Sequence, residues 1–472
     1  MTAARAVLAV AAILAWGDLT LRLGGSLSAH RRLPERYALA WLAGCIVTSW
    51  LVFVALWVDV PLFPAVVGLG ACGLAAWLIA TWRRPTFDPA EHGGTAARRR
   101  PAALGMVFLG VIGAVVAEVA LAALARPLTA WDAWVNWASK ARVLVIDQGM
   151  TQSLYSDPSR LPTNLDYPLL LPISEAWLWT WAGTSDDVLV GLLSLLHTIA
   201  LVATLWAALK RRVAVTPALG FTALLVTTPR FDLMAAAGLA DLLLAALVVT
   251  ALAMAADHTD SARGGCDQAR AWILPAILCA GMPWLKNEGW VWWGVTVVAL
   301  LGRFALPRRP ADGRIPAAPW PTVPFLAVAF LPPALWQLFL ALRGTERFAF
   351  FAPTPARMWA HIYRLPEIAV EAMRHLLSTD WNLIWVLVAI TVILRRRRAL
   401  QGGSAAPIAG VAVFLAAVSA SFMFSRFEPY VEHVANSLDR LIWQALPVAV
   451  WWLAVQAAES GLVATAEPNV ST

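Results

Sequence analysis

The sequence predicts an all-α, polytopic membrane protein with about 13 transmembrane helices. Of its 472 residues, 60% are hydrophobic and only 14% are charged, whereas a soluble globular domain carries about 25% charged residues. Tryptophan is abundant, with 26 residues against 5 tyrosines, and its ring favours the membrane–water interface, where the N–H stays hydrated. The chain therefore has too little polar surface for a water-soluble particle and enough tryptophan for many interface crossings.

Apolar stretches long enough to cross a bilayer recur along the whole chain. A spanning helix needs about 20 predominantly apolar residues. The predicted spans lie near residues 6–23, 37–57, 62–82, 103–125, 187–209, 214–229, 232–255, 271–283, 289–302, 321–342, 380–394, 406–424 and 438–456. We divide the chain into an N-terminal three-helix membrane region, residues 1–102, and a larger transmembrane catalytic region, residues 103–472.

Basic residues predict the orientation in the membrane. If the spans alternate, these groups all fall on one side: Arg31, Arg32 and Arg36; Arg83, Arg84 and Arg98–Arg100; Lys210–Arg212; Arg303, Arg308, Arg309 and Arg314; and Arg395–Arg398. That side is predicted to be cytoplasmic. The basic residues in these short loops explain the net charge of +7, so we expect no nucleic-acid partner. The opposite face holds the longer loops 126–186, 343–379 and 425–437 and is expected to carry the function, with interfacial or re-entrant helices at 169–183 and 365–377.

The first polar motif on that face is WDAWVNWASK, residues 131–140. Trp131, Trp134 and Trp137 recur every three residues, so an α-helix would place them on one flank. Asp132 and Lys140 are eight residues apart, roughly two helical turns, and would lie near one face. An interfacial helix with a tryptophan belt and incidental charges explains the same spacing.

The second motif is DYPLLLP, which begins at Asp166 and Tyr167. Its two prolines favour an extended entry into a short helix. Asp166 at the mouth of that helix is either an N-cap or a functional acid.

The third motif is Lys286-Asn287-Glu288, within residues 271–302. One helix of that length would measure about 48 Å, too long for a hydrocarbon core of about 30 Å. We therefore expect two helices separated by a polar break. Charges at such a break usually line a cavity, and a lysine there suits an anionic phosphate group; a plain outer loop is the alternative.

The fourth motif precedes and enters the last predicted span. It contains Glu428, Glu432, His433, Asn436, Asp439 and Arg440. Asp439 and Arg440 could pair with each other, or Arg440 could snorkel. Deeper in the bundle, Asp241 is an acid that should face the protein interior.

Other common chemistries leave no signal in the sequence. Metal-ligand spacing, a Walker loop and a GxSxG elbow do not occur. We expect no cofactor, and a divalent metal would have to be held by scattered carboxylates.

The motifs, in their order along residues 103–456, resemble the GT-C superfamily. WDAWVNWASKARVL, DYPLLLP, GLADLLLA, LKNEG and SLDRLIWQALP are similar to bacterial membrane glycosyltransferases related to protein mannosyltransferases and aminoarabinose transferases. Members of this family move a sugar from a polyprenyl-phosphate carrier to an acceptor outside the cytoplasm. The family often has two adjacent acids in the first outer loop, whereas here Trp131 and Ala133 flank Asp132.

The resemblance implies roles for individual residues. Asp132 matches the hallmark acid and is the expected general base, with Asp166 as a second catalytic candidate. The expected donor- and phosphate-binding residues are Lys140, Lys286, Glu288 and Arg440, and those of the substrate groove are Trp131, Trp134, Tyr167 and His433. The implied partners are a polyprenyl-phosphate sugar, a glycan, lipid or protein acceptor and the bilayer, in a bacterial inner membrane with the active site on the non-cytoplasmic side.

Two other functional classes fit parts of the sequence. A transporter or flippase of a lipid-linked or small solute would use polar groups along a path through the bilayer, and Asp241 is the main candidate for one. A structural component of an envelope complex would need no active carboxylate. The grouping of the polar motifs on one face favours an enzyme over a transporter, and loss of activity on single carboxylate substitutions would exclude the structural component.

Overall fold

The structure of the protein is a computed structural model that describes residues 2–25, 33–82, 102–150, 164–256, 270–304, 321–345, 354–399, 401 and 405–466. The ordered elements in these ranges are helices, and the β-type pairing among them is one isolated bridge between Val213 and Thr465. The predicted all-α class is therefore confirmed for the part of the chain that is described.

Eight helices in the described ranges are long and apolar enough to cross a membrane. Seven of them are α1 (Thr2–Leu23), α2 (Leu33–Trp57), α3 (Leu62–Trp82), α4 (Ala103–Ala125), α8 (Asp187–Lys210), α15 (Thr322–Arg343) and α20 (Tyr430–Glu459). The eighth is the continuous stretch Ala405–Phe424, made of α19 (Ala405–Ser421) and a 3₁₀ turn (Phe422–Phe424). These helices indicate an integral membrane protein.

The remaining predicted spans fall on shorter helices. These are α9 (Val215–Val226), α11 (Ala240–Ala256), α13 (Ile273–Leu285), α14 (Gly289–Phe304) and α18 (Ile384–Ala399). In α18 the arginine run lies inside the helix, which extends to Ala399, so only its first part is apolar. The count of about 13 spans is not confirmed by the structure and stays a prediction.

The predicted break between two helices at residues 286–288 is present. α13 ends at Leu285, Lys286 has extended backbone angles, and α14 begins at Gly289. A Cβ atom on Gly289 would lie 2.0 Å from the carbonyl oxygen of Met282, so only glycine allows the second helix to start this close to the first.

Short helices connect the long ones. They are a π-helical turn (Ala133–Ala138), α5 (Ser139–Asp147), α7 (Leu170–Ala182), α10 (Phe231–Ala236), α16 (Pro355–Ala360) and α17 (Leu365–Leu376). The amphipathic helix expected at 365–377 is α17. The stretch 169–183 forms α7, which is almost wholly buried and packs against α1, α2 and α5.

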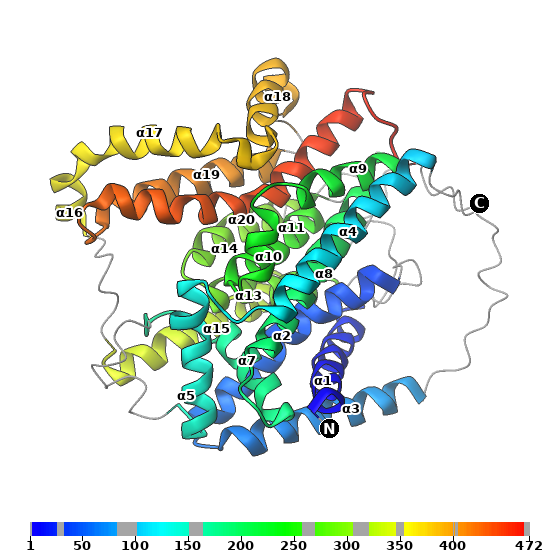
Figure 1. Ribbon diagram of the computed structural model, residues 1–472, viewed down its shortest axis with the longest axis vertical. Helices are drawn as coiled ribbons and strands as arrows, with labels where there is room; N and C mark the ends of the chain where they lie inside the picture. Colours follow the sequence, from blue (N-terminus) through cyan, green and yellow to red (C-terminus); the bar gives the residue numbers. More distant parts are fainter. Residues whose placement is uncertain are drawn as a thin grey trace.

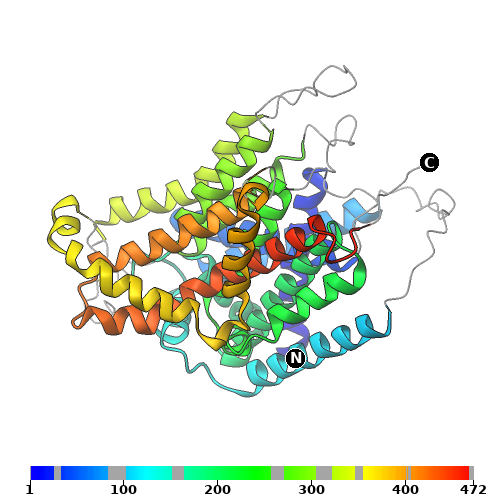
Figure 2. The same ribbon diagram turned by 90° about the horizontal axis from the view of Figure 1, so that it is seen from above.

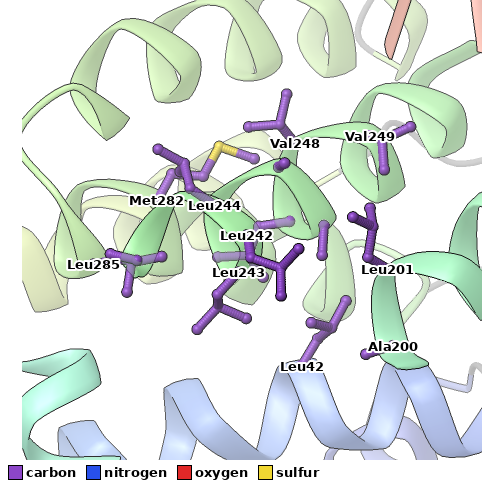
Figure 3. Packing of buried hydrophobic residues seen from close by; sticks show 14 of the residues in the cluster. Leu42, Ala200, Leu201, Leu242, Leu243, Leu244, Val248, Val249, Met282 and Leu285 are labelled. Atoms are coloured by element: carbon purple, nitrogen blue, oxygen red, sulfur yellow. The ribbon is translucent and has the colours of Figure 1, made fainter. Parts of the chain in front are cut away.

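The core of the molecule is centred on α11. All 17 of its residues are buried, and α2, α8, α13, α14 and α20 pack around it. Figure 3 shows Leu242 and Leu243 of α11 among Leu42 of α2, Leu201 of α8 and Leu285 of α13. In a bilayer such packing stabilises through dispersion between well-fitted side chains rather than through removal of water.

The N-terminal region shares this core. α2 packs against α7, α8 and α13, and one continuous cluster of buried residues includes side chains from α1 through α20. In Figures 1 and 2 the blue α1 and α2 lie beside the green central helices, and α17, α19 and α20 cover the other side.

Four described residues from the predicted basic groups contact neighbouring helices near their ends. Arg36 contacts Asp18 at the end of α1 at 2.8 Å, and Arg211 contacts Glu35 at the start of α2 at 2.8 Å. Arg212 donates to Ala256 at the end of α11, and Arg395 donates to Gln456 near the end of α20. The other predicted groups, at 31–32, 83–84, 98–100, 308–309 and 314, and the side chain of Arg303, lie outside the described residues.

Two glycines let α1 and α2 pack backbone to backbone. A Cβ atom at Gly17 would lie 1.7 Å from the carbonyl oxygen of Ala40, and one at Gly44 would lie 2.1 Å from that of Ile13. Small residues are the usual means by which membrane helices approach this closely.

We expect Gly17→Ala to lower the melting temperature of the detergent-purified protein, because the added methyl group must separate the two helices. Gly110→Ala on α4, where nothing lies within 4 Å of the new Cβ, is the matched control and should melt like the wild type. Equal melting temperatures for Gly17→Ala and Gly110→Ala would contradict this packing.

Candidate active site

Charged residues from all the predicted motifs converge in one region of the fold. We call the following seven the charged cluster: Asp132, Lys140, Asp166, Asp241, Lys286, Glu288 and Arg440. They come from the position just before the π-helical turn, from α5, the loop before α7, the start of α11, the break between α13 and α14, and the third turn of α20. Hydrogen bonds, ion pairs and charge interactions link them.

Asp132 forms an ion pair with Arg440. Arg440 Nη1 lies 2.6 Å from Asp132 Oδ2, and Asn136 donates to Asp132 Oδ1 at 3.0 Å. The two charged side chains are 24% and 23% exposed, so small molecules can reach both. This pair joins segments 308 residues apart in sequence and is the most accessible ion pair within the charged cluster.

Lys140 is buried and does not pair with Asp132 as its helical spacing suggested. Its Nζ donates to the carbonyl oxygens of Asn164 and Tyr167 at 2.6 and 3.1 Å, and the side chain of Asn164 donates to Asn136. Burial lowers the pKa of Lys140 to about 7, and the nearby Asp166 carboxylate acts in the opposite direction. Lys140 therefore fastens the loop that carries Asp166 to α5.

Asp166 lies against the α13–α14 break. Asn287 donates to Asp166 Oδ2 at 3.1 Å, and the indole of Trp336 donates to the Asp166 carbonyl oxygen at 3.2 Å. Burial raises the pKa of Asp166, while the Lys140 charge lowers it. The alternative role as an N-cap is wrong, because Leu169 occupies the N-cap position of α7 and no side chain caps that helix.

Lys286 is the first residue of the α13–α14 break, and two carboxylates neutralise its charge. Its Nζ is 2.9 Å from Asp241 Oδ1 and 3.4 Å from Glu288 Oε1, and Gln444 donates to Asp241 Oδ1 at 2.5 Å. The side chains of Lys286 and Asp241 are only 4% and 2% exposed. Together with Gln444, the pair thus ties α13, α11 and α20 to one another near Asp132 and Arg440, whose charges act on Lys286.

The three tryptophans of the first motif do not share a flank, contrary to the prediction. Trp131 and Trp134 are 65% and 51% exposed, with ring centroids 6.1 Å apart, whereas Trp137 is 2% exposed and packs against Tyr167. The turn from Ala133 to Ala138 is π-helical, and its wider i→i+5 winding does not keep residues three apart on one side. π-helical turns occur frequently at functional sites.

His433 lies seven residues before Arg440 on α20, about two turns away on the same side of the helix. Its Nδ1 contacts Ser425 Oγ at 2.8 Å, and the rings of Phe422 and Phe427 pack on it. Arg364, which is 4% exposed, holds this turn by donating to the Ser425 carbonyl oxygen and to Glu428, each at 3.0 Å.

Asp439 and Arg440 do not pair with each other through their side chains. Asp439 Oδ2 lies 2.7 Å from Arg230 Nη1, and Arg440 turns to Asp132. Neighbouring residues on a helix point about 100° apart, so each reaches a different segment. Neither Arg230 as the partner of Asp439 nor Gln444 as the partner of Asp241 was predicted from the sequence, because the two members of each pair lie far apart in the chain.

The cluster combines four carboxylates with three cations. Among the described residues, no three His, Cys, Asp or Glu side chains gather closely enough to hold a metal ion. The chemistry that these groups offer is proton transfer at Asp132 and binding of an anion at the accessible Arg440.

Comparisons with protein-family models, curated proteins and solved structures give no match to this chain.

Proposed function

We propose that the protein is a membrane glycosyltransferase of the GT-C type. It would move a sugar from a polyprenyl-phosphate carrier to an acceptor hydroxyl on the non-cytoplasmic face. The observation that supports this most is the accessible Asp132–Arg440 pair, 2.6 Å long, in a cluster whose other charges are mostly buried. The resemblance of the sequence motifs to that superfamily supplies the reaction class.

In this proposal Asp132 is the general base. Glycosyl transfer passes through an oxocarbenium-like state, and the attacking hydroxyl must lose its proton. Asp132 accepts that proton while the acceptor oxygen bonds to the anomeric carbon. The bond from that carbon to the phosphate oxygen breaks, and its electron pair leaves with the polyprenyl phosphate.

Arg440 is the cation best placed to meet the departing phosphate. Its guanidinium can offer several N–H donors to phosphate oxygens while keeping one on Asp132. Lys140 and Lys286 are 1% and 3% exposed, and their ammonium groups already have partners within the protein. We therefore assign phosphate stabilisation to Arg440 and a supporting role to both lysines, Glu288 and Asp166.

The aromatic residues frame the reacting groups. Trp131 and Trp134 present exposed rings directly beside Asp132, which suits contact with an apolar carrier or with a sugar face. Tyr167 and His433 lie close enough to Asp132 and Arg440 for the charges of that pair to act on both side chains. We propose these four residues as the walls of the substrate groove.

The proposed arrangement in the membrane has about 13 spans. The helix ends that carry Arg36, Arg211, Arg212 and Arg395 face the cytoplasm by the positive-inside rule. The charged cluster then faces the opposite side of a bacterial inner membrane. Loops 126–186, 343–379 and 425–437 contribute the acceptor site.

The test is turnover of a panel of polyprenyl-phosphate sugars by the protein in lipid nanodiscs, measured as release of polyprenyl phosphate. Turnover of at least one donor is the expected result. Movement of a lipid-linked solute across proteoliposomes, with no donor consumed, would contradict the proposal and identify a transporter.

A further inference from the structure

Arg230 joins two acidic residues from segments far apart in the chain. It lies at the start of α10, where Nη1 is 2.7 Å from Asp439 Oδ2 and Nε is 3.2 Å from Asp380 Oδ2. Asp439 belongs to α20, and Asp380 to the short 3₁₀ turn (Thr379–Trp381) that follows α17. The planar guanidinium can reach both carboxylates at once, whereas a lysine offers a single point charge.

The residues next to Arg230 and Asp380 in the chain are themselves packed in place. Phe231, next to Arg230, is fully buried and packs against Trp443 of α20 with ring centroids 6.3 Å apart. On the other side, Trp381 is 1% exposed and Asn382 donates to Thr227 at the end of α9 at 3.4 Å. Arg230 is therefore held between two anchored segments.

Asp439 is the residue directly before Arg440. Besides Arg230, it accepts a hydrogen bond from the Arg440 backbone N–H at 2.8 Å. Within six residues, α20 makes polar contacts with three different segments, from Asp439 to Arg230, from Arg440 to Asp132 and from Gln444 to Asp241. These contacts fix both the position of α20 along its axis and its rotation about that axis at the charged cluster.

We propose that Arg230 is a positioning residue for the transfer reaction, acting through Asp439 to hold Arg440 in register with Asp132 and linking that register to the Asp380 turn after α17. This inference rests on the proposed function. Arg230 lies outside the Asp132–Arg440 contact and acts only through its neighbours. A displacement of about 1 Å at a reacting group can cost up to a hundredfold in rate.

The test is the kinetics of Arg230→Gln, Arg230→Lys and Asp439→Asn with a donor that the wild type turns over. We expect Arg230→Gln to lower kcat about tenfold with less than a threefold change in donor KM. The reason is that the interaction of Arg440 with the departing phosphate becomes stronger in the transition state. Arg230→Lys should recover part of kcat, and Arg230→Gln combined with Asp439→Asn should be no slower than Arg230→Gln alone.

Arg374→Gln is the matched control. Arg374 pairs with Glu371 on α17 at 3.0 Å and is 73% exposed, so its loss should leave kcat unchanged. Wild-type kcat in Arg230→Gln, or a rise in KM alone, would overturn the inference.

Hydrogen–deuterium exchange separates failure of this inference from failure of the proposed function. If the wild type consumes no donor, the proposed function fails. The placement of α20 is then tested by exchange of residues 430–441. Faster exchange in Arg230→Gln than in Arg374→Gln supports the inference, and equal exchange overturns it.

Discussion

Arg440→Gln is expected to lower the rate of sugar transfer about 10²- to 10³-fold, because a preorganised charge that stabilises the leaving group is worth that much in comparable sites. The guanidinium of Arg440 is 23% exposed and lies 2.6 Å from the proposed base, so its removal affects both the departing phosphate and the placement of Asp132. Single-turnover consumption of a labelled donor measures this effect without interference from product release.

Arg440→Lys gives the informative comparison. A lysine keeps the charge but lacks the planar set of N–H donors that can contact phosphate and carboxylate together. The rate of the Arg440→Lys variant should therefore lie between those of the wild type and Arg440→Gln. Arg374→Gln again provides a distant arginine control. Wild-type rates in Arg440→Gln would remove Arg440 from the mechanism.

Lys286→Met is expected to destabilise the protein by about 3–5 kcal/mol, the usual cost of leaving one member of a buried ion pair without its partner. Lys286 and Asp241 are almost completely buried and only 2.9 Å apart. Without Lys286, the Asp241 carboxylate retains the amide of Gln444, which does not offset a full charge. Titration of the detergent-solubilised protein with denaturant measures the loss in the free energy of unfolding.

The double variant Asp241→Asn/Lys286→Met should recover much of that stability, since no unpaired charge remains. The Glu371–Arg374 pair on α17, whose arginine is 73% exposed, is the control, and breaking it should cost no more than about 1 kcal/mol. A small effect of Lys286→Met, similar to that of Arg374→Gln, would show that Asp241 and Lys286 are not paired as described.

Local sequence signals predicted most helices of the bundle and every segment of the charged cluster. The polar break at 286–288 follows from length alone, because residues 271–302 cannot form one spanning helix in a core of about 30 Å. The amphipathic α17 follows from apolar residues that recur at helical spacing between charged ones. These features are determined by residues that lie close together in the chain, so they can be predicted from the sequence.

Pairings across the bundle could not be predicted in the same way. Nothing near Lys286 in the chain indicates that its partner is Asp241, or that Arg440 reaches Asp132 while Asp439 reaches Arg230. These contacts depend on how helices pack. Similarly, the burial of Trp137 depends on a π-helical turn, which an α-helical spacing argument places wrongly.

The lysines illustrate how the structure alters the expected chemistry. Both Lys140 and Lys286 were expected to bind phosphate, and that role stays a prediction. Lys140 donates to two backbone carbonyls and Lys286 pairs with Asp241. In the sequence, a lysine that binds a ligand and one that fastens a loop are indistinguishable.

The most direct test of the central claim is sugar transfer by purified wild type, Asp132→Asn and Asp232→Asn in the same nanodisc assay. Asp232 is an exposed acid on α10, so its variant controls for the loss of a carboxylate as such. We expect turnover by the wild type and Asp232→Asn and a loss of about 10²- to 10⁴-fold in Asp132→Asn, the usual contribution of a general base. Equal turnover by all three proteins would contradict the assignment of Asp132, and no turnover by any of them, from folded protein, would contradict the proposed function itself.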